Sequence, residues 1–156
     1  MSEIHIRGAR AEEAPLLSAL CQRSKAHWGY DDAFMKASRA ALAVDERMIA
    51  NAYVLVAEDC NGVPVGVAAV TRLAQAGAYD LARLFVAPEA IGRGIGAQLI
   101  GAILSWLKRK DAQRLVIEAD PNAAGFYARM GGVLIGDVPS EAVEGRRLPL
   151  FEIRIG

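Results

Sequence analysis

The stretch from Phe85 to Ile100, FVAPEAIGRGIGAQLI, places Gly92, Gly94 and Gly96 between an apolar run and an amphipathic run. Glycine has no Cβ, so such a loop lets its backbone approach a ligand closely. A helix that begins directly after the loop would point its unpaired N–H groups and the positive end of its dipole at the same place. The pattern therefore predicts a phosphate-binding turn between a strand and a helix.

Composition indicates a globular chain with a sizeable core. The 156 residues are 53% hydrophobic and 23% charged, which argues against disorder. A chain of this length usually forms one domain, so we expect a single domain over residues 1–156. The apolar content also predicts that a second copy covers part of the surface, as in a homodimer.

Charge and cysteine usage exclude several kinds of partner. Lys and Arg together number 18, as do Asp and Glu, so no global field draws the chain to nucleic acid or to an anionic membrane. Cys21 and Cys60 show neither metal-ligand spacing nor a disulfide framework, and we expect both to be buried or half-buried. His5 and His27 lack a partner at ligand spacing, so no metal site is predicted.

The start of the chain and its hydropathy favour a cytoplasmic protein. The first residues, MSEIHIRGAR, lack the charged-then-apolar pattern of an export signal. No apolar run approaches the roughly 20 residues needed to span a bilayer. A reducing cytoplasm also fits the two isolated cysteines.

The N-terminal third predicts one strand followed by two helices. Residues 3–8 form the strand, and residues 10–24 form the first helix. Its apolar face consists of Leu16, Leu17, Leu20 and Cys21. A cap at Asp31 or Asp32 opens the second helix, which we expect to continue to about Met48.

The centre of the chain predicts a three-strand antiparallel meander. The β-rich runs AYVLVAED and VPVGVAAVTRL are separated by a turn at Asn61-Gly62, a pair that tolerates positive φ and signals a hairpin. A third run, AYDLARLFV, follows a turn near Gly77. These three runs form the middle of the predicted sheet.

The C-terminal half alternates helices and strands. A helix starts at the glycines, RLVIEAD is a strand, and Asp120-Pro121 opens a helix that runs to Met130 and stops at Gly131-Gly132. The runs VLIGDV and LPLFEIRI supply two more strands, joined by the loop PSEAVEGRR. The order β-α-α-β-β-β-α-β-α-β-β predicts an α/β (α+β) mixed sheet, with a parallel crossover from the meander to RLVIEAD.

Two other phosphate motifs compete for the glycine cluster. A Walker loop needs Gly-Lys-Ser/Thr at its end, and the chain has Gly96-Ala97-Gln98 instead, which excludes it. GRGIGA does satisfy the dinucleotide pattern, with Glu118 and Asp120 at the end of the next strand. However, five residues separate the preceding strand from Gly92, and the chain has a single crossover unit, so a dinucleotide-binding module stays an alternative.

Two segments together resemble the GCN5-related N-acetyltransferase (GNAT) family. These are ARLFVAPEAIGRGIGAQLI in the meander and ADPNAAGFYARMGG after the next strand. The resemblance implies the GNAT fold and an acetyl-CoA-dependent N-acetyltransferase. It also implies that the acetyl group passes directly to a primary amine of a small-molecule acceptor in a ternary complex. A non-catalytic acyl-CoA-binding module is the second alternative.

The resemblance also implies which residues hold the cofactor. The main chain of the central strand would bind the pantetheine arm, the glycine loop would bind the diphosphate, and the next helix would lie beside the thiol. The residues concerned are Leu84, Phe85, Val86, Ile91, Gly92, Arg93, Gly94, Ile95, Gly96, Ala97, Asn122 and Phe126. Ile91 departs from the Gln or Arg that is common at its position, which removes one side-chain contact to phosphate.

By the same resemblance, Tyr127 protonates the departing sulfur and Asp80 accepts the proton of the amine. A phenol with a pKa near ~10 can supply a proton to a thiolate whose pKa is near ~8.5. Glu118 is the alternative base, and both carboxylates have an ordinary reading as residues at strand ends. No cysteine stands near the motifs as an acyl carrier.

The resemblance also implies that the acceptor lies against the turn AHWGYDD, which carries His27, Trp28 and Tyr30. The ordinary reading of these aromatic residues is that they pin the junction of two helices. The loop PSEAVEGRR resembles a recurrent feature of bacterial relatives with a similar turn, which implies that Arg146 or Arg147 clamps a carboxylate of the acceptor; the ordinary reading is a solvated surface pair. If so, the acceptor is an amine that also bears an acid.

Overall fold

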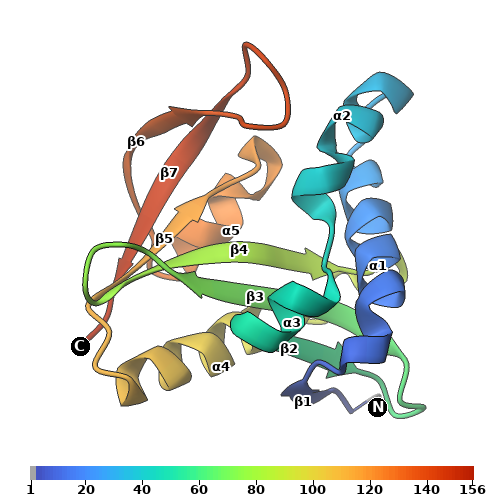
Figure 1. Cartoon of the computed structure of the whole chain (residues 1–156), viewed down its shortest axis with the longest axis horizontal. Coiled ribbons are helices and arrows are strands. Elements are labelled where there is room, and N and C mark those ends of the chain that lie inside the picture. The colour runs from blue at the N-terminus through green and yellow to red at the C-terminus, as the bar shows by residue number, and fades with distance from the viewer. Residues whose placement is uncertain (1–2) are drawn as a thin grey trace.

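The computed structural model describes residues 3–156, so residues 1 and 2 of the predicted domain lie outside the described part. The elements follow the predicted order, except that two helices lie between residues 32 and 51 where one was expected (Figure 1). The strands are β1 His5–Gly8, β2 Tyr53–Glu58, β3 Pro64–Arg72, β4 Ala78–Val86, β5 Arg114–Glu118, β6 Val133–Pro139 and β7 Arg147–Arg154. The helices are α1 Ala14–Ala26, α2 Asp32–Leu42, α3 Glu46–Asn51, α4 Ile95–Arg109 and α5 Ala124–Arg129, with 3₁₀ turns at Ala11–Glu13, Pro88–Ala90 and Pro121–Ala123.

The described strands form one mixed sheet of seven strands in the order β1-β2-β3-β4-β5-β7-β6. The predicted meander β2-β3-β4 is antiparallel, and β4 pairs in parallel with β5 through the crossover helix α4. Both features confirm the α/β mixed-sheet prediction. At the hairpin between β2 and β3, Gly62 has φ of +79°, as the Asn-Gly signal predicts.

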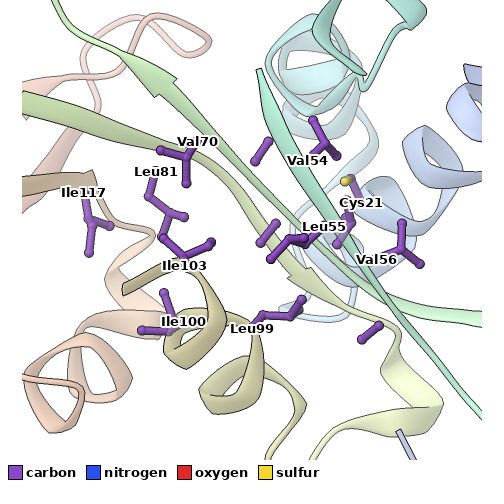
Figure 2. Packing of buried hydrophobic residues seen from close by; sticks show 14 of the residues in the cluster. Cys21, Val54, Leu55, Val56, Val70, Leu81, Leu99, Ile100, Ile103 and Ile117 are labelled. Carbon is purple, nitrogen blue, oxygen red and sulfur yellow. The ribbon is translucent and has the colours of Figure 1, made fainter. Parts of the chain in front are cut away.

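Helices cover the two faces of the meander, as Figures 1 and 2 show. Leu99 and Ile103 of α4 point toward Leu55 of β2 on one face (Figure 2). On the other face, Cys21 of α1 lies close to Val54 of β2. All five side chains are at most 6% exposed, so β2 is buried on both faces.

The strands β4 and β5 pair only at the start of β4. Ala78–Asp80 lie beside Arg114–Val116, and beyond Asp80 the edge of β4 that faces β5 has no strand partner among residues 3–156. The register of β4 against β3 shifts between Arg83 and Leu81, which leaves one extra residue in β4. Such a bulge bends a strand and increases its twist, and Figure 1 shows β5 turning away from β4.

The prediction of one helix up to about Met48 is wrong, because the structure has two helices there, α2 and α3. The chain extends at Ala43, and the amide and carbonyl of Val44 both bond the Ser18 hydroxyl of α1, at 2.8 and 2.9 Å. Asp45 then caps α3 through the Met48 amide. Tertiary contacts of Val44 with α1 therefore override the helix-forming composition.

Two burial predictions in the N-terminal half are also wrong. Leu16 is 53% exposed, whereas Leu17, Leu20 and Cys21 are almost fully buried. Adjacent helical residues point about 100° apart, so Leu16 falls outside the stripe that Leu17 starts. Cys60 is exposed because it lies in the turn between β2 and β3 rather than in a strand.

The strand β6 is an edge strand with an apolar surface. Val133, Leu134 and Ile135 are 62%, 60% and 47% exposed. If a homodimer forms, this edge offers apolar area for it, but the homodimer stays a prediction. Among residues 3–156, no helix is long and apolar enough to cross a membrane.

Candidate active site

A cavity of about 600 Å³ lies where β4 separates from β5. Residues of β4, the glycine loop, the first turn of α4, the end of β5, α5 and the C-terminal end of α1 line it. The predicted site residues among them are Trp28, Leu84, Phe85, Val86, Ile91, Gly92, Gly94, Ile95, Gly96, Ala97, Glu118, Asn122, Phe126 and Tyr127. Residues far apart in the sequence thus meet around one space.

The glycine loop has the backbone geometry of an anion site. Gly92 and Gly94 have φ of +89° and +75°, a region that side chains disfavour, and Gly94 is the N-cap of α4. No side chain in the described chain caps this helix, so the N–H groups of its first turn remain available. The loop and the dipole of a 15-residue helix therefore point at the cavity together.

Gly96 allows α4 to approach α5. A Cβ at Gly96 would lie 3.2 Å from Cζ of Phe126, closer than ordinary van der Waals contact. The third glycine thus has a packing reason, in contrast to Gly92 and Gly94, where a Cβ would meet nothing within 4 Å. Gly92 and Gly94 therefore face open space, whereas Gly96 packs closely against Phe126.

The wall opposite α5 is the free edge of β4. Leu84, Phe85 and Val86 are half-buried and pair with β3 on one side only. An extended ligand can therefore bond their main chain as an added strand would. Ile91, at the rim, is 49% exposed. Its side chain is apolar and, unlike Gln or Arg, has no group that could bond a phosphate.

Tyr127 is buried in the protein and contacts the cavity. The side chain is 7% exposed, and its ring meets Phe126 edge-on with centroids 5.2 Å apart. Tyr127 is one of the residues that line the cavity, and among residues 3–156 no buried side-chain polar atom lacks a partner. Burial, with a smaller contribution from Asp120, raises the pKa of Tyr127 above its usual value, so the hydroxyl keeps its proton.

Asp80 and Glu118 lie on the same face of neighbouring strands. Asp80 is beside Val116, and Glu118 follows two residues later on β5. Burial and the charge of Glu118 raise the pKa of Asp80 to about 6, while Arg83 opposes the shift. Glu118 lines the cavity and is more exposed, and burial raises its pKa as well.

A network of mostly half-buried polar side chains closes one side of the cavity. Asp120, at the end of β5, accepts hydrogen bonds from Lys25 of α1 and from the Tyr30 hydroxyl, the latter at 2.9 Å. Arg146 donates to the same hydroxyl at 2.8 Å, and Asn122 donates to it at 3.1 Å. The Tyr30 and Phe34 rings stack at 3.9 Å beneath the Arg146 guanidinium.

The charges of this network stabilise one another. Burial alone would raise the pKa of Asp120, but the bonds from Lys25 and from the Asn122 amide outweigh it and lower the pKa. Burial lowers the pKa of Lys25, and the Asp120 carboxylate limits that shift. Asp120 therefore holds two cations, Lys25 and Arg146, whose side chains are only 12% and 19% exposed.

The residues predicted to bind the acceptor lie in different places and do not form one surface. Trp28 lines the cavity and is 48% exposed, whereas His27 is exposed outside the lining residues. Tyr30 and Arg146 are joined in the Asp120 network. Arg147 pairs with Asp137 on the exposed hairpin of β6 and β7, away from the cavity.

Arg93 and Asp80 do not line the cavity, although their neighbours do. No pattern in the sequence indicates Lys25, whereas Asp120 is predicted as a helix cap, which is confirmed, or as the acidic residue of a dinucleotide site. These two residues are 95 positions apart, so no local pattern predicts their contact. Among residues 3–156, no group of His, Cys, Asp or Glu side chains is arranged to hold a metal ion.

Comparisons with known proteins identify the family. A model of the acetyltransferase (GNAT) domain matches residues 17–142. A GCN5-related N-acetyltransferase from Rhodopseudomonas palustris is 26% identical, with a TM-score of 0.76 over 97% of this chain and 95% of that one. A search of curated proteins finds no match.

Two further structures resemble the chain in fold. PaiA N-acetyltransferase from Thermoplasma acidophilum, solved in complex with coenzyme A, has a TM-score of 0.79 at 18% identity, over 97% of this chain and 99% of that one. The ribosomal-protein-S18-alanine N-acetyltransferase from Escherichia coli has a TM-score of 0.73 at 14% identity, over 99% and 95%. The chain belongs to the GNAT acetyltransferase family, whose enzymes use acetyl-CoA.

The Asp120 network predicts a specific stability difference. Asp120→Asn should lower the free energy of unfolding by about 2 kcal/mol at pH 7, because it leaves Lys25 and Arg146 buried without a counter-charge. Asp137→Asn removes the exposed pair with Arg147 and should cost no more than about 0.5 kcal/mol. Urea unfolding of both variants measures the two costs, and equal costs would contradict the role given to Asp120.

If the glycine loop binds phosphate, two glycine substitutions in and next to α4 should differ in their effect on coenzyme A affinity. Gly94→Ala puts a side chain at φ of +75° and should weaken coenzyme A binding by about ten-fold, because the loop must change its conformation. Gly101→Ala, on the exposed side of α4, should leave binding unchanged and slightly raise stability. Calorimetric titration with coenzyme A compares them. Unaltered affinity in the Gly94 variant would argue against the loop as the phosphate site.

Proposed function

We propose that this GNAT acetyltransferase moves an acetyl group from acetyl-CoA to a primary amine of a small-molecule acceptor, by direct transfer in a ternary complex. The observation that carries the proposal is the 600 Å³ cavity, since the anion loop, the free edge of β4 and Tyr127 all border it. We further propose that residues 1–156 act as one domain.

The described residues fit coenzyme A. The N–H groups at the start of α4 offer donors to the diphosphate, and Arg129 of α5 adds a positive charge to the lining. The main chain of Leu84–Val86 offers donors and acceptors to the amides of the pantetheine arm. Phe126 and Ile91 give the arm an apolar surface.

The reaction requires two proton movements. Acetyl-CoA supplies an activated thioester. A C–N bond forms to the neutral amine as the C–S bond breaks, so an ammonium must first lose one proton, and a second proton must leave the nitrogen as the thiolate gains one. The chain must therefore provide a base on the acceptor side and a proton donor near the sulfur.

Tyr127 is the proton donor in this proposal. Its hydroxyl keeps its proton because burial raises its pKa, and Tyr127 lines the cavity in which the sulfur would lie. Transfer to a thiolate in water would be uphill, but a thiolate that leaves within the same cavity is itself desolvated and therefore more basic. Tyr127 thus stabilises the departing sulfur by a hydrogen bond that becomes a proton transfer.

Asp80 is the proposed base, and Glu118 remains the alternative. With a pKa raised to about 6, Asp80 is ionised at neutral pH and is a stronger base than an ordinary carboxylate. Asp80 is not among the cavity-lining residues, so a water molecule would relay the proton to it. Glu118 borders the cavity and would accept the proton without a relay.

The cysteines support direct transfer without an acyl-enzyme. Cys21 is fully buried, and burial raises the pKa of its thiol to about 12, so almost no thiolate exists at neutral pH. Cys60 is exposed in the turn between β2 and β3 and is not part of the cavity lining. Neither thiol is placed to carry the acetyl group.

Tyr127→Phe tests the proton donor. Removing the hydroxyl should lower kcat by about 100-fold and leave coenzyme A affinity unchanged, because the ring still packs against Phe126. Stability should also be retained, since the ring keeps its contacts with Phe126 and Phe151. Thiol release with an amine panel measures kcat, and Tyr53→Phe, remote from the cavity, is the matched control. A variant with full turnover would remove Tyr127 from the mechanism.

The pH profile tests the base. If Asp80 must be ionised, kcat/KM rises with pH through about 6 and then levels, until the acceptor amine itself loses its proton. Asp80→Asn should abolish this rise and lower activity, whereas Glu118→Gln should keep the rise at a lower pH, because Glu118 contributes to the raised pKa of Asp80. The opposite outcome, with the rise lost only in the Glu118 variant, would assign the base to Glu118.

A further inference from the structure

Arg83 of β4 is a half-buried cation that bonds main-chain carbonyls instead of a carboxylate. Its Nη1 donates to the Ala82 carbonyl at 2.8 Å, and its Nε and Nη2 donate to the Ala43 carbonyl at 3.1 and 2.7 Å. Within residues 3–156, no salt bridge includes Arg83. Burying a cation without a bonded carboxylate is unfavourable, so a gain in stability does not account for this placement.

The first of these carbonyls belongs to the bulge of β4. The register shift between Leu81 and Arg83 makes Ala82 the extra residue, without a Cα partner in β3. The parallel pairing of β4 with β5 has already ended at Asp80. Ala82 also lines the cavity. Arg83 therefore bonds the main chain at the point where β4 leaves β5 and the cavity begins.

The second carbonyl belongs to the break between α2 and α3. Ala43 is the C-cap of α2, and its extended backbone ends the helix. The Ser18 hydroxyl bonds both the amide and the carbonyl of the next residue, Val44. The break is therefore held from two directions, by Ser18 of α1 and by Arg83 of β4.

The helix α2 depends on the contacts at its two ends. Of its 11 residues, those that are buried are Ser38 and Leu42. Near its start, the Phe34 ring stacks on Tyr30 at 3.9 Å, and Tyr30 bonds Asp120, which lines the cavity. Figure 1 shows α2 beside α1 and extending away from the central strands. Because few side chains of α2 are packed, its position relative to β4 is set mainly by its ends, one of which Arg83 bonds.

Arg83 thus joins the strand that borders the cofactor cavity to the helix that follows the predicted acceptor turn. A guanidinium suits this position because its donors lie on different edges of a planar group, and here Nε and Nη2 bond one carbonyl while Nη1 bonds the other. We propose, resting on the proposed acetyltransferase function, that Arg83 is a positioning residue that holds α2 against the bulge of β4 and so aligns the bound acceptor with the thioester. Alignment of two bound reactants raises turnover more than it raises the affinity for either one.

Arg83→Met tests this inference in the thiol-release assay, with butylamine, phenethylamine and ethanolamine as acceptors. For the amine that the unaltered chain uses fastest, kcat should fall by about ten-fold, whereas Kd for coenzyme A should change by less than about two-fold. Arg39→Met removes an exposed cation from the last turn of α2 and is the matched control, which should change neither. Unchanged turnover in the Arg83 variant, or equal losses of turnover and coenzyme A affinity, would overturn the proposal.

Arg83→Lys separates geometry from charge. Lysine keeps the positive charge that acts on Asp80, but its single ammonium cannot occupy both edges of the guanidinium. We therefore expect kcat to stay about three-fold below that of the unaltered chain. Full turnover in this variant would mean that only the charge matters and would contradict positioning. This variant also tests the inference if urea unfolding shows that Arg83→Met does not fold.

A double-mutant cycle with the other end of α2 tests the route of the effect. Phe34→Leu removes the stack on Tyr30. If Arg83 acts through α2, the double variant should lose little more turnover than the Arg83→Met variant, because either substitution already frees the helix. Losses in kcat that multiply would contradict this route.

The same assays distinguish this inference from the function on which it rests. Transfer by the unaltered chain, together with unchanged kcat in the Arg83 variants, refutes the inference alone. Absence of transfer by the unaltered chain to every acceptor, while coenzyme A still binds, refutes the proposed function instead.

Discussion

The separation of β4 from β5 is the constraint on which the site depends. Parallel pairing joins β4 to β5 only at Ala78–Asp80. After the bulge that follows, β4 continues to pair with β3 but no longer pairs with β5. An unpaired strand edge inside a protein leaves polar main-chain groups that need a partner. Here that edge borders the cavity, and α4 begins with its own unpaired N–H groups at the same end. Both sets of donors are left free by the fold itself.

Charge is distributed along the cavity in an ordered way. The glycine loop, the start of α4 and Arg129 give one end a positive character, which suits phosphate. At the end of β5, Glu118 adds a negative charge to the lining. Between them, Asp120 ties α1 to the end of β5 and to the loop of Arg146. A buried ion pair is costly to form, so we interpret this network as a means of fixing geometry rather than of gaining stability.

Local patterns predicted the fold well and long-range contacts poorly. The meander, the crossover and the helix after Gly94 follow from periodicity and glycine positions, which act over a few residues. The break at Val44 depends on Ser18, and the position of Lys25 depends on Asp120, which lies 95 residues away. Arg146 was predicted to face a ligand, but the structure engages it with Tyr30. The sequence alone does not show which charged side chains pair, because the partners lie on distant segments.

The central claim is that main-chain amides of the glycine loop and of the β4 edge hold coenzyme A. Amide-resolved NMR titration with coenzyme A tests it most directly, because each N–H group reports its own environment. We expect the largest shifts at residues 92–97 and at Leu84–Val86, with saturation at one equivalent. Shifts concentrated elsewhere, with these amides unchanged at saturation, would contradict it.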